Sequence, residues 1–134
     1  MPLSRRQCLP DRTQKPICII DDDESVADSL KTLLETYGFR VQSYGSGNEF
    51  LADARHRAAG FLLIDQHMPG MSGLDVIDQL QKDGVQIPAI LISGRLDAST
   101  RTRAARLGIR ELVDKPFAAG RLVGLIRATL SEAS

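Results

Sequence analysis

The sequence predicts an α/β domain in which five parallel strands and five helices alternate in a doubly wound sheet. Short runs rich in apolar and β-branched residues recur along the chain, and segments with a helical pattern separate them. Three of these runs are apolar on both faces, as expected of strands covered by helices on both sides. The 134-residue chain has the length of one such domain and leaves no room for a second.

Each expected element can be placed along the chain. The strands are predicted at 17–21, 40–44, 60–65, 88–93 and 111–115, and the helices at about 24–37, 46–58, 73–83, 97–107 and 118–131. The second run alternates in polarity, so we expect it at an edge of the sheet. Ser46 and Glu49 have the spacing of a capping box, and Gly38, Gly84 and Gly108 stand where helices are expected to end. Residues 1–15 are polar and predict a flexible leader, followed by the domain at 16–134.

Composition excludes several classes of protein. The formal net charge is zero, which favours neither nucleic acid nor an anionic membrane as a partner. No apolar stretch approaches the roughly 20 residues of a membrane span, and no signal peptide is evident, so the sequence predicts a cytoplasmic protein. Cys8 and Cys18 do not suggest a disulfide framework, and Cys18 is expected to be a buried, reduced thiol.

Chemically versatile side chains end four of the five expected strands. Asp21 and Asp22 end the first, Asp65 the third, Ser93 the fourth and Lys115 the fifth. Each has an ordinary alternative role as a helix-start acid, a turn residue or a surface lysine. The carboxyl ends of parallel strands share one edge, however, and ligands bind there at the switch point in strand order. The joint occurrence therefore favours one functional site.

The acidic residues of this site predict a bound cation. Two carboxylates about 4 Å apart repel each other by roughly 4 kcal/mol at an effective dielectric of about 20. An all-oxygen, carboxylate-rich set favours Mg²⁺, and no spacing of His and Cys suggests zinc. Mg²⁺ and lysine are common partners of phosphoryl oxygens, and a carboxylate can itself be the nucleophile. The simplest interpretation makes Asp65 a phosphate acceptor.

The motifs "IIDDDES", "LLIDQHMPGMSG", "ILISG" and "VDKPF" occur in this order along the chain. With them, the chain over roughly 16–130 resembles the receiver domain of two-component response regulators and is similar to FixJ-like receivers. The resemblance implies a flavodoxin-like fold with strand order 2-1-3-4-5. It also implies phosphorelay signal transduction, in which the chain is a phosphoacceptor that changes its protein–protein interactions and is not an enzyme in the usual sense.

The resemblance assigns a role to each residue of the site. Asp65 is the phosphorylated residue, and Asp21, Asp22, Asp65 and the main-chain carbonyl of His67 bind Mg²⁺. Ser93 bonds the phosphoryl group and shifts toward it, and Lys115, before a cis bond to Pro116, pairs with a phosphoryl oxygen. The implied donor is the phosphohistidine of a histidine kinase or histidine phosphotransfer protein, and the receiver itself catalyses transfer to Asp65 and hydrolysis from it.

Two further positions lie near the expected site: Leu112 departs from the family pattern, and His67 has two alternative roles. Leu112 stands where the family usually has Tyr or Phe, so coupling to Ser93 by an aromatic flip is not expected. His67 is a bulky, ionisable side chain beside Asp65, which either influences the phosphoryl lifetime or is a solvated loop histidine.

The fourth expected helix suggests an output surface. Its inward face offers little beyond Ala98, Thr102 and Ala105, which predicts weak docking and a mobile helix. Arg101, Arg103 and Arg106 are expected on the outer side, with Arg110 nearby. This is either a solvated face or, with the fifth strand and helix, a docking surface for an acidic protein or a receiver dimer. DNA binding is not expected, and the chain reads as a single-domain receiver or a truncated one.

The sequence disfavours three alternative functions. A small-molecule phosphatase of the haloacid-dehalogenase type requires Asp-x-Asp, whereas position 67 is His. A nucleotide or flavin binder requires a glycine- or hydroxyl-rich loop after the first strand, where this chain has acids that repel phosphate. A receiver fold that switches without phosphorylation is disfavoured by the intact set of Asp, Ser and Lys residues.

Overall fold

The computed structural model describes residues 15–109 and 111–133. Its strands are β1 (Ile17–Ile20), β2 (Val41–Tyr44), β3 (Phe61–Asp65), β4 (Ala89–Ser93) and β5 (Glu111–Asp114). Its helices are α1 (Glu24–Thr36), α2 (Gly47–Ala52), α3 (Gly73–Lys82), α4 (Ala98–Arg106) and α5 (Ala119–Ala133), with a 3₁₀ turn η2 (His56–Ala58). The five strands pair in parallel in the order β2-β1-β3-β4-β5, which confirms the predicted fold and the edge position of the second strand.

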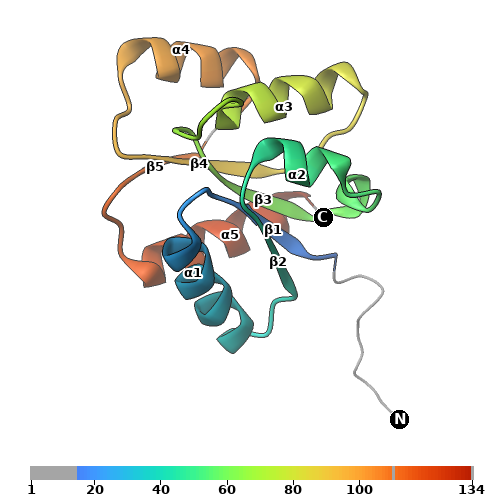
Figure 1. Cartoon of the computed structure of the whole chain (residues 1–134). Helices are drawn as coiled ribbons and strands as arrows, with labels where there is room; N and C mark the ends of the chain where they lie inside the picture. The colour runs from blue at the N-terminus through green and yellow to red at the C-terminus, as the bar shows by residue number, and fades with distance from the viewer. Residues whose placement is uncertain (1–14, 110, 134) are drawn as a thin grey trace.

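The sheet lies between two layers of helices (Figure 1). Helices α1 and α5 cover one face, and α2, α3 and α4 cover the other. Alternate residues of each central strand enter the two cores: Ile17 and Ile19 pack on the α1–α5 side, whereas Cys18 and Ile20 pack on the opposite side. Both faces of β1, β3 and β4 are therefore buried, as their continuous apolar sequences require.

The helix ends follow the expected local chemistry. Gly38, Gly84 and Gly108 have φ values of 91°, 75° and 80°, a left-handed conformation that glycine adopts without steric cost after a helix. The Ser46 side chain accepts a hydrogen bond from the Glu49 amide at 3.1 Å, as predicted. The Glu49 carboxylate accepts from Gly45 and not from Ser46, so the expected capping box is only half formed.

The predicted second helix, 46–58, is too long. Helix α2 ends at Ala52, because Asp53 has an extended backbone (φ −72°, ψ 123°). The Asp53 carboxylate accepts a hydrogen bond from the Tyr44 hydroxyl at 2.7 Å and pairs with Arg55 at 3.1 Å. The contact with Tyr44 ties Asp53 to β2.

The predicted inward face of the fourth helix is wrong. Thr100 and Ala104 are the buried residues of α4, whereas Ala98, Thr102 and Ala105 are exposed. Position 104 is followed three residues later by half-buried Leu107, which packs against the core between the sheet and this helix layer. Positions 100, 104 and 107 are four and three residues apart, so they share the face of the helix that lies toward the sheet.

Arg103 consequently does not lie on the outer side of α4. Its guanidinium contacts the Asp75 carboxylate of α3 at 2.8 Å. The pKa of Asp75 is lowered, first by the hydrogen bond from the Ser72 backbone and then by Arg103. Arg110, expected near the other arginines, lies outside the described residues.

We expect Arg103→Gln to loosen α4 while barely changing global stability. The Arg103 and Asp75 side chains are 42% and 41% exposed, and ion pairs this exposed contribute about 0.2–1 kcal/mol. With two buried residues, α4 has little buried area to hold it in place, so loss of this contact should let its amides exchange hydrogen faster. Hydrogen exchange of residues 98–106 measures this, with Arg106→Gln as the matched control. Equal exchange in the two variants would contradict the role of the pair.

The structure also tests the expectations about membrane spans and about Cys18. No helix within 15–109 or 111–133 has the length and apolar character needed to cross a membrane. Cys18 is a buried free thiol, and burial raises its pKa to about 11. Cys8 and all of the expected leader except Lys15 lie outside the described residues.

Candidate functional site

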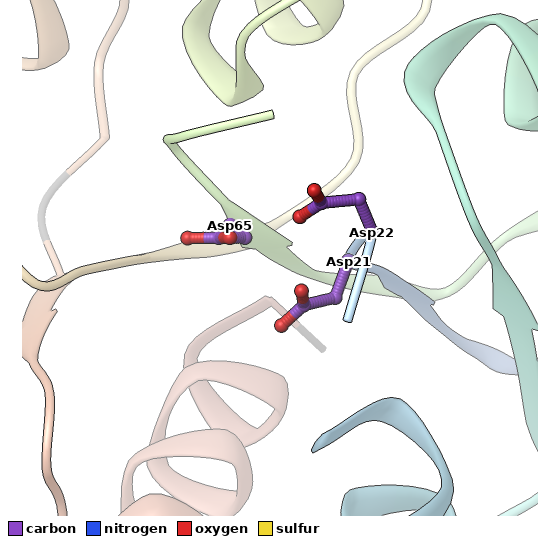
Figure 2. Close-up of side chains that lie close together, drawn as sticks. All are labelled: Asp21, Asp22 and Asp65. Carbon is purple, nitrogen blue, oxygen red and sulfur yellow. The ribbon is translucent and has the colours of Figure 1, made fainter. Parts of the chain in front are cut away.

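Three aspartates meet where β1 and β3 end (Figure 2). Asp21 and Asp22 follow β1, and Asp65 is the last residue of the neighbouring strand β3. One carboxylate oxygen from each lies within 4.8 Å of the other two. Strand β1 has β2 on one side and β3 on the other, so this is the switch point in strand order, where the sequence predicted a site.

Two of these carboxylates are removed from bulk water. Asp21 is 4% exposed and Asp65 is 6% exposed, whereas Asp22 lies in solvent. Burial raises the pKa of Asp21 and that of Asp65, because the charged form loses hydration. Backbone amides offset part of this cost: the Asp23 N–H donates to Asp21 at 2.9 Å, and the His67 N–H donates to Asp65 at 3.4 Å.

Lys115 places a positive charge beside two of these carboxylates. Its ammonium lies 3.7 Å from an Asp21 oxygen and 3.6 Å from an Asp65 oxygen. The peptide bond between Lys115 and Pro116 is cis, as expected from the family resemblance. One ammonium beside three ionised carboxylates leaves a net negative charge, so a further cation at the site would reduce the repulsion between the carboxylates.

The donor set fits a small, hard divalent cation. The three converging side chains supply only carboxylate oxygens, which Mg²⁺ prefers and soft metals do not. The exposed Asp22 leaves the site open to water, and Mg²⁺ typically keeps several water ligands. His67, whose carbonyl is the expected fourth protein ligand, lies in the loop that begins directly after Asp65.

The hydroxyl of Ser93 is engaged locally. Ser93 is fully buried at the end of β4, where its Oγ donates to the Arg95 carbonyl at 2.8 Å and accepts from the Arg95 amide at 2.9 Å. To bond a phosphoryl group on Asp65, Ser93 would have to exchange the hydrogen bond that it donates. Leu112 is half-buried and packs against the core on the α2–α4 side of the sheet.

Several residues that shape the site were missed by the sequence analysis. Ser72 and Asp75 form a complete capping box at the start of α3, which their S-x-x-D spacing could have indicated. Gly73 packs so tightly that a Cβ atom there would lie 2.7 Å from the Asp65 carbonyl oxygen. Gln66 bonds the first amides of α3, and no local sequence pattern announces that contact.

Two features characterise this chain: a doubly wound α/β fold and a cluster of three aspartates at the switch point in strand order. Residues 17–127 match the family model described as the response regulator receiver domain. The chain therefore belongs to the response regulator receiver family and is a receiver domain of two-component signalling. The phosphoacceptor role is general in this family.

Individual relatives agree with this assignment. The response regulator protein TodT of Pseudomonas putida F1 is 42% identical over 85% of this chain and 50% of its own length. The transcriptional regulatory protein FixJ of Azorhizobium caulinodans is 32% identical over 89% of this chain and 56% of its own. A CheY-like receiver from Methanospirillum hungatei JF-1 superposes with a TM-score of 0.83 at 26% identity, covering 90% of this chain and 96% of that one. The chain thus spans about half the length of these two curated relatives.

Proposed function

We propose that Asp65 accepts a phosphoryl group from a partner phosphohistidine in a Mg²⁺-dependent reaction. The observation that carries this proposal is the convergence of Asp21, Asp22 and Asp65 within 4.8 Å, with Lys115 3.6 Å from Asp65. A nucleophilic carboxylate, a cation site and an ammonium in one place are the parts that phosphoryl transfer needs. The same parts serve hydrolysis of the product.

The transfer step follows from the position of Asp65. An Asp65 carboxylate oxygen attacks phosphorus, the bond from phosphorus to the donor imidazole nitrogen breaks, and the imidazole leaves as a neutral group after taking up a proton. Mg²⁺ at Asp21, Asp22, Asp65 and the His67 carbonyl would neutralise charge on the phosphoryl oxygens. Hydrolysis of the resulting acyl phosphate by water returns Asp65 and inorganic phosphate.

Two side chains would respond to the new group. Lys115 already lies near Asp65 and would pair with a phosphoryl oxygen, since Mg²⁺ would take over much of the compensation of Asp21. Ser93 would donate its hydroxyl to the phosphoryl group in place of the Arg95 carbonyl. Freeing that carbonyl would alter the turn that leads into α4, which links the chemistry to the α4–β5–α5 face.

We propose this face as the docking surface for a downstream protein or a second receiver. Arg101 and Arg106 are exposed on α4 and give it a positive character, which suits an acidic partner. The upstream partner would be a histidine kinase or a histidine phosphotransfer protein, and the setting would be the cytoplasm. A single-domain role and a role within a longer regulator are both compatible with this mechanism.

Acetyl phosphate tests the proposal without a partner. The wild-type chain should gain the mass of one phosphoryl group in Mg²⁺ and none after chelation with EDTA, read by intact mass. If acetyl phosphate gives no product, a histidine kinase in Mg²⁺ is used as the donor. Failure with both donors, together with no measurable Mg²⁺ binding, would contradict the proposal and favour a receiver fold that switches without phosphorylation.

A further inference from the structure

Gln66 joins the end of β3 to the start of α3 through both its main chain and its side chain. Its carbonyl oxygen accepts a hydrogen bond from the Gly73 amide at 3.2 Å. Its side-chain Oε1 accepts one from the Leu74 amide at 2.9 Å. The Gln66 amide donates to the Ile92 carbonyl of β4 at 2.9 Å, so the residue is fixed on the strand side as well.

These bonds complete the first turn of α3. A helix begins with amides that have no partner inside the helix. In α3, Gly73 and Leu74 donate to Gln66, and the next amide, Asp75, donates to Ser72 Oγ at 3.2 Å. Gln66 therefore satisfies two of these three amides, a task usually given to the N-cap side chain.

The same bonds close the loop that carries His67. Residues 67–72 run between the two points joined by Gln66, and Met68 is the loop residue buried in the core. Gly73 lies against the Asp65 carbonyl, where a Cβ atom would come within 2.7 Å. One main-chain and one side-chain hydrogen bond of Gln66 therefore join the two ends of this loop, next to Asp65.

We propose that Gln66 is a positioning residue for the Mg²⁺ site, acting by holding the 67–72 loop so that the His67 carbonyl faces the three carboxylates. This rests on the proposed function, because it needs a cation at Asp21, Asp22 and Asp65. Groups that orient a metal ligand through hydrogen bonds typically change affinity by about 10–100-fold when they are removed. Gln66 touches neither the metal nor the phosphoryl group in this role.

The test compares Mg²⁺ affinity in the wild type, Gln66→Met and Gln79→Met, titrated with Mg²⁺ alone and followed by NMR. Gln66→Met keeps the length of the side chain and removes the accepting oxygen. Gln79 lies on α3, the helix whose first amides Gln66 bonds, and its side chain donates to exposed Asp83 at the other end of that helix, so it is the matched control. Gln66→Ala serves as a second variant, and thermal midpoints establish that each protein is folded.

We expect both Gln66 variants to weaken Mg²⁺ binding by about tenfold or more and Gln79→Met to match the wild type. The Leu74 amide should also lose protection from hydrogen exchange in the Gln66 variants alone. A wild-type Mg²⁺ affinity in both Gln66 variants would overturn the positioning role and leave the Mg²⁺ site standing. No Mg²⁺ binding by the wild type would instead overturn the site itself, and this inference with it.

Discussion

Asp65→Asn is expected to abolish phosphorylation by acetyl phosphate or by a histidine kinase. The amide oxygen of Asn is a poor nucleophile, whereas the ionised carboxylate of Asp65 attacks phosphorus directly. The substitution keeps the size of the side chain and an oxygen that can accept from the His67 amide, so the fold should be retained. Intact mass after incubation with Mg²⁺ and the donor measures the effect as the loss of the phosphorylated species.

Asp78→Asn is the matched control for that experiment. Asp78 lies on α3 and pairs with Lys82 at 3.3 Å, in a contact whose two side chains are 37% and 68% exposed. Removing its charge should leave phosphorylation at the wild-type rate. A phosphorylated species in Asp65→Asn at the wild-type level would contradict the assignment of the acceptor.

Asp21→Asn is expected to stabilise the chain relative to the wild type without Mg²⁺ and to destabilise it relative to the wild type with Mg²⁺. Without a divalent cation, the variant should be more stable than the wild type, because a buried charge beside Asp65 has been removed. With Mg²⁺ the wild type should gain stability, by about 2.7 kcal/mol at a hundred times its Kd, and the variant should gain little. Urea unfolding with EDTA and with Mg²⁺ measures both changes, with Asp28→Asn on α1 as the control.

The pH dependence of stability in EDTA provides a second comparison between the wild type and Asp21→Asn. The pKa of Asp21 is raised above 3.8 in the folded state, mainly by burial, so the folded chain holds this proton more tightly than the unfolded chain. The contribution of this tighter proton binding to the free energy of unfolding is complete below pH 3.8. It is lost as the pH rises through the raised pKa of Asp21 in the folded chain. Asp21→Asn should therefore show a smaller decline in stability over this window. An equal decline, with unchanged Mg²⁺ stabilisation, would contradict the role of Asp21.

The strands and the site were predictable because both depend on short, strongly patterned stretches. The apolar runs of β1, β3 and β4 identify strands buried on both faces, and the residues that end them must meet at one edge of a parallel sheet. Asp21 and Asp65 were located in this way, and Lys115, at the end of the fifth predicted strand, lies within ion-pair distance of both. The family motifs supplied the strand order and the cis bond before Pro116.

The predictions for the end of α2 and the buried face of α4 were wrong because tertiary contacts outweighed the local sequence pattern. Helix α2 ends early because Asp53 bonds Tyr44 and Arg55, a contact that helical periodicity does not encode. In α4 the apolar signal is weak, and the residues that face the core are Thr100 and Ala104, followed by half-buried Leu107. Gln66 was missed for the same reason, since its partner amide lies eight residues away in the next element.

Chemical location of the phosphoryl group shows most directly whether Asp65 carries it. Borohydride reduces an acyl phosphate to the corresponding alcohol, which converts a phosphorylated aspartate into homoserine. After treatment of the wild-type chain with Mg²⁺ and the phosphodonor, peptide mass spectrometry should find homoserine at position 65 alone. Homoserine at position 21 or 22 would contradict the assignment of Asp65 as the acceptor. The absence of homoserine from a chain that has gained a phosphoryl group would contradict it as well.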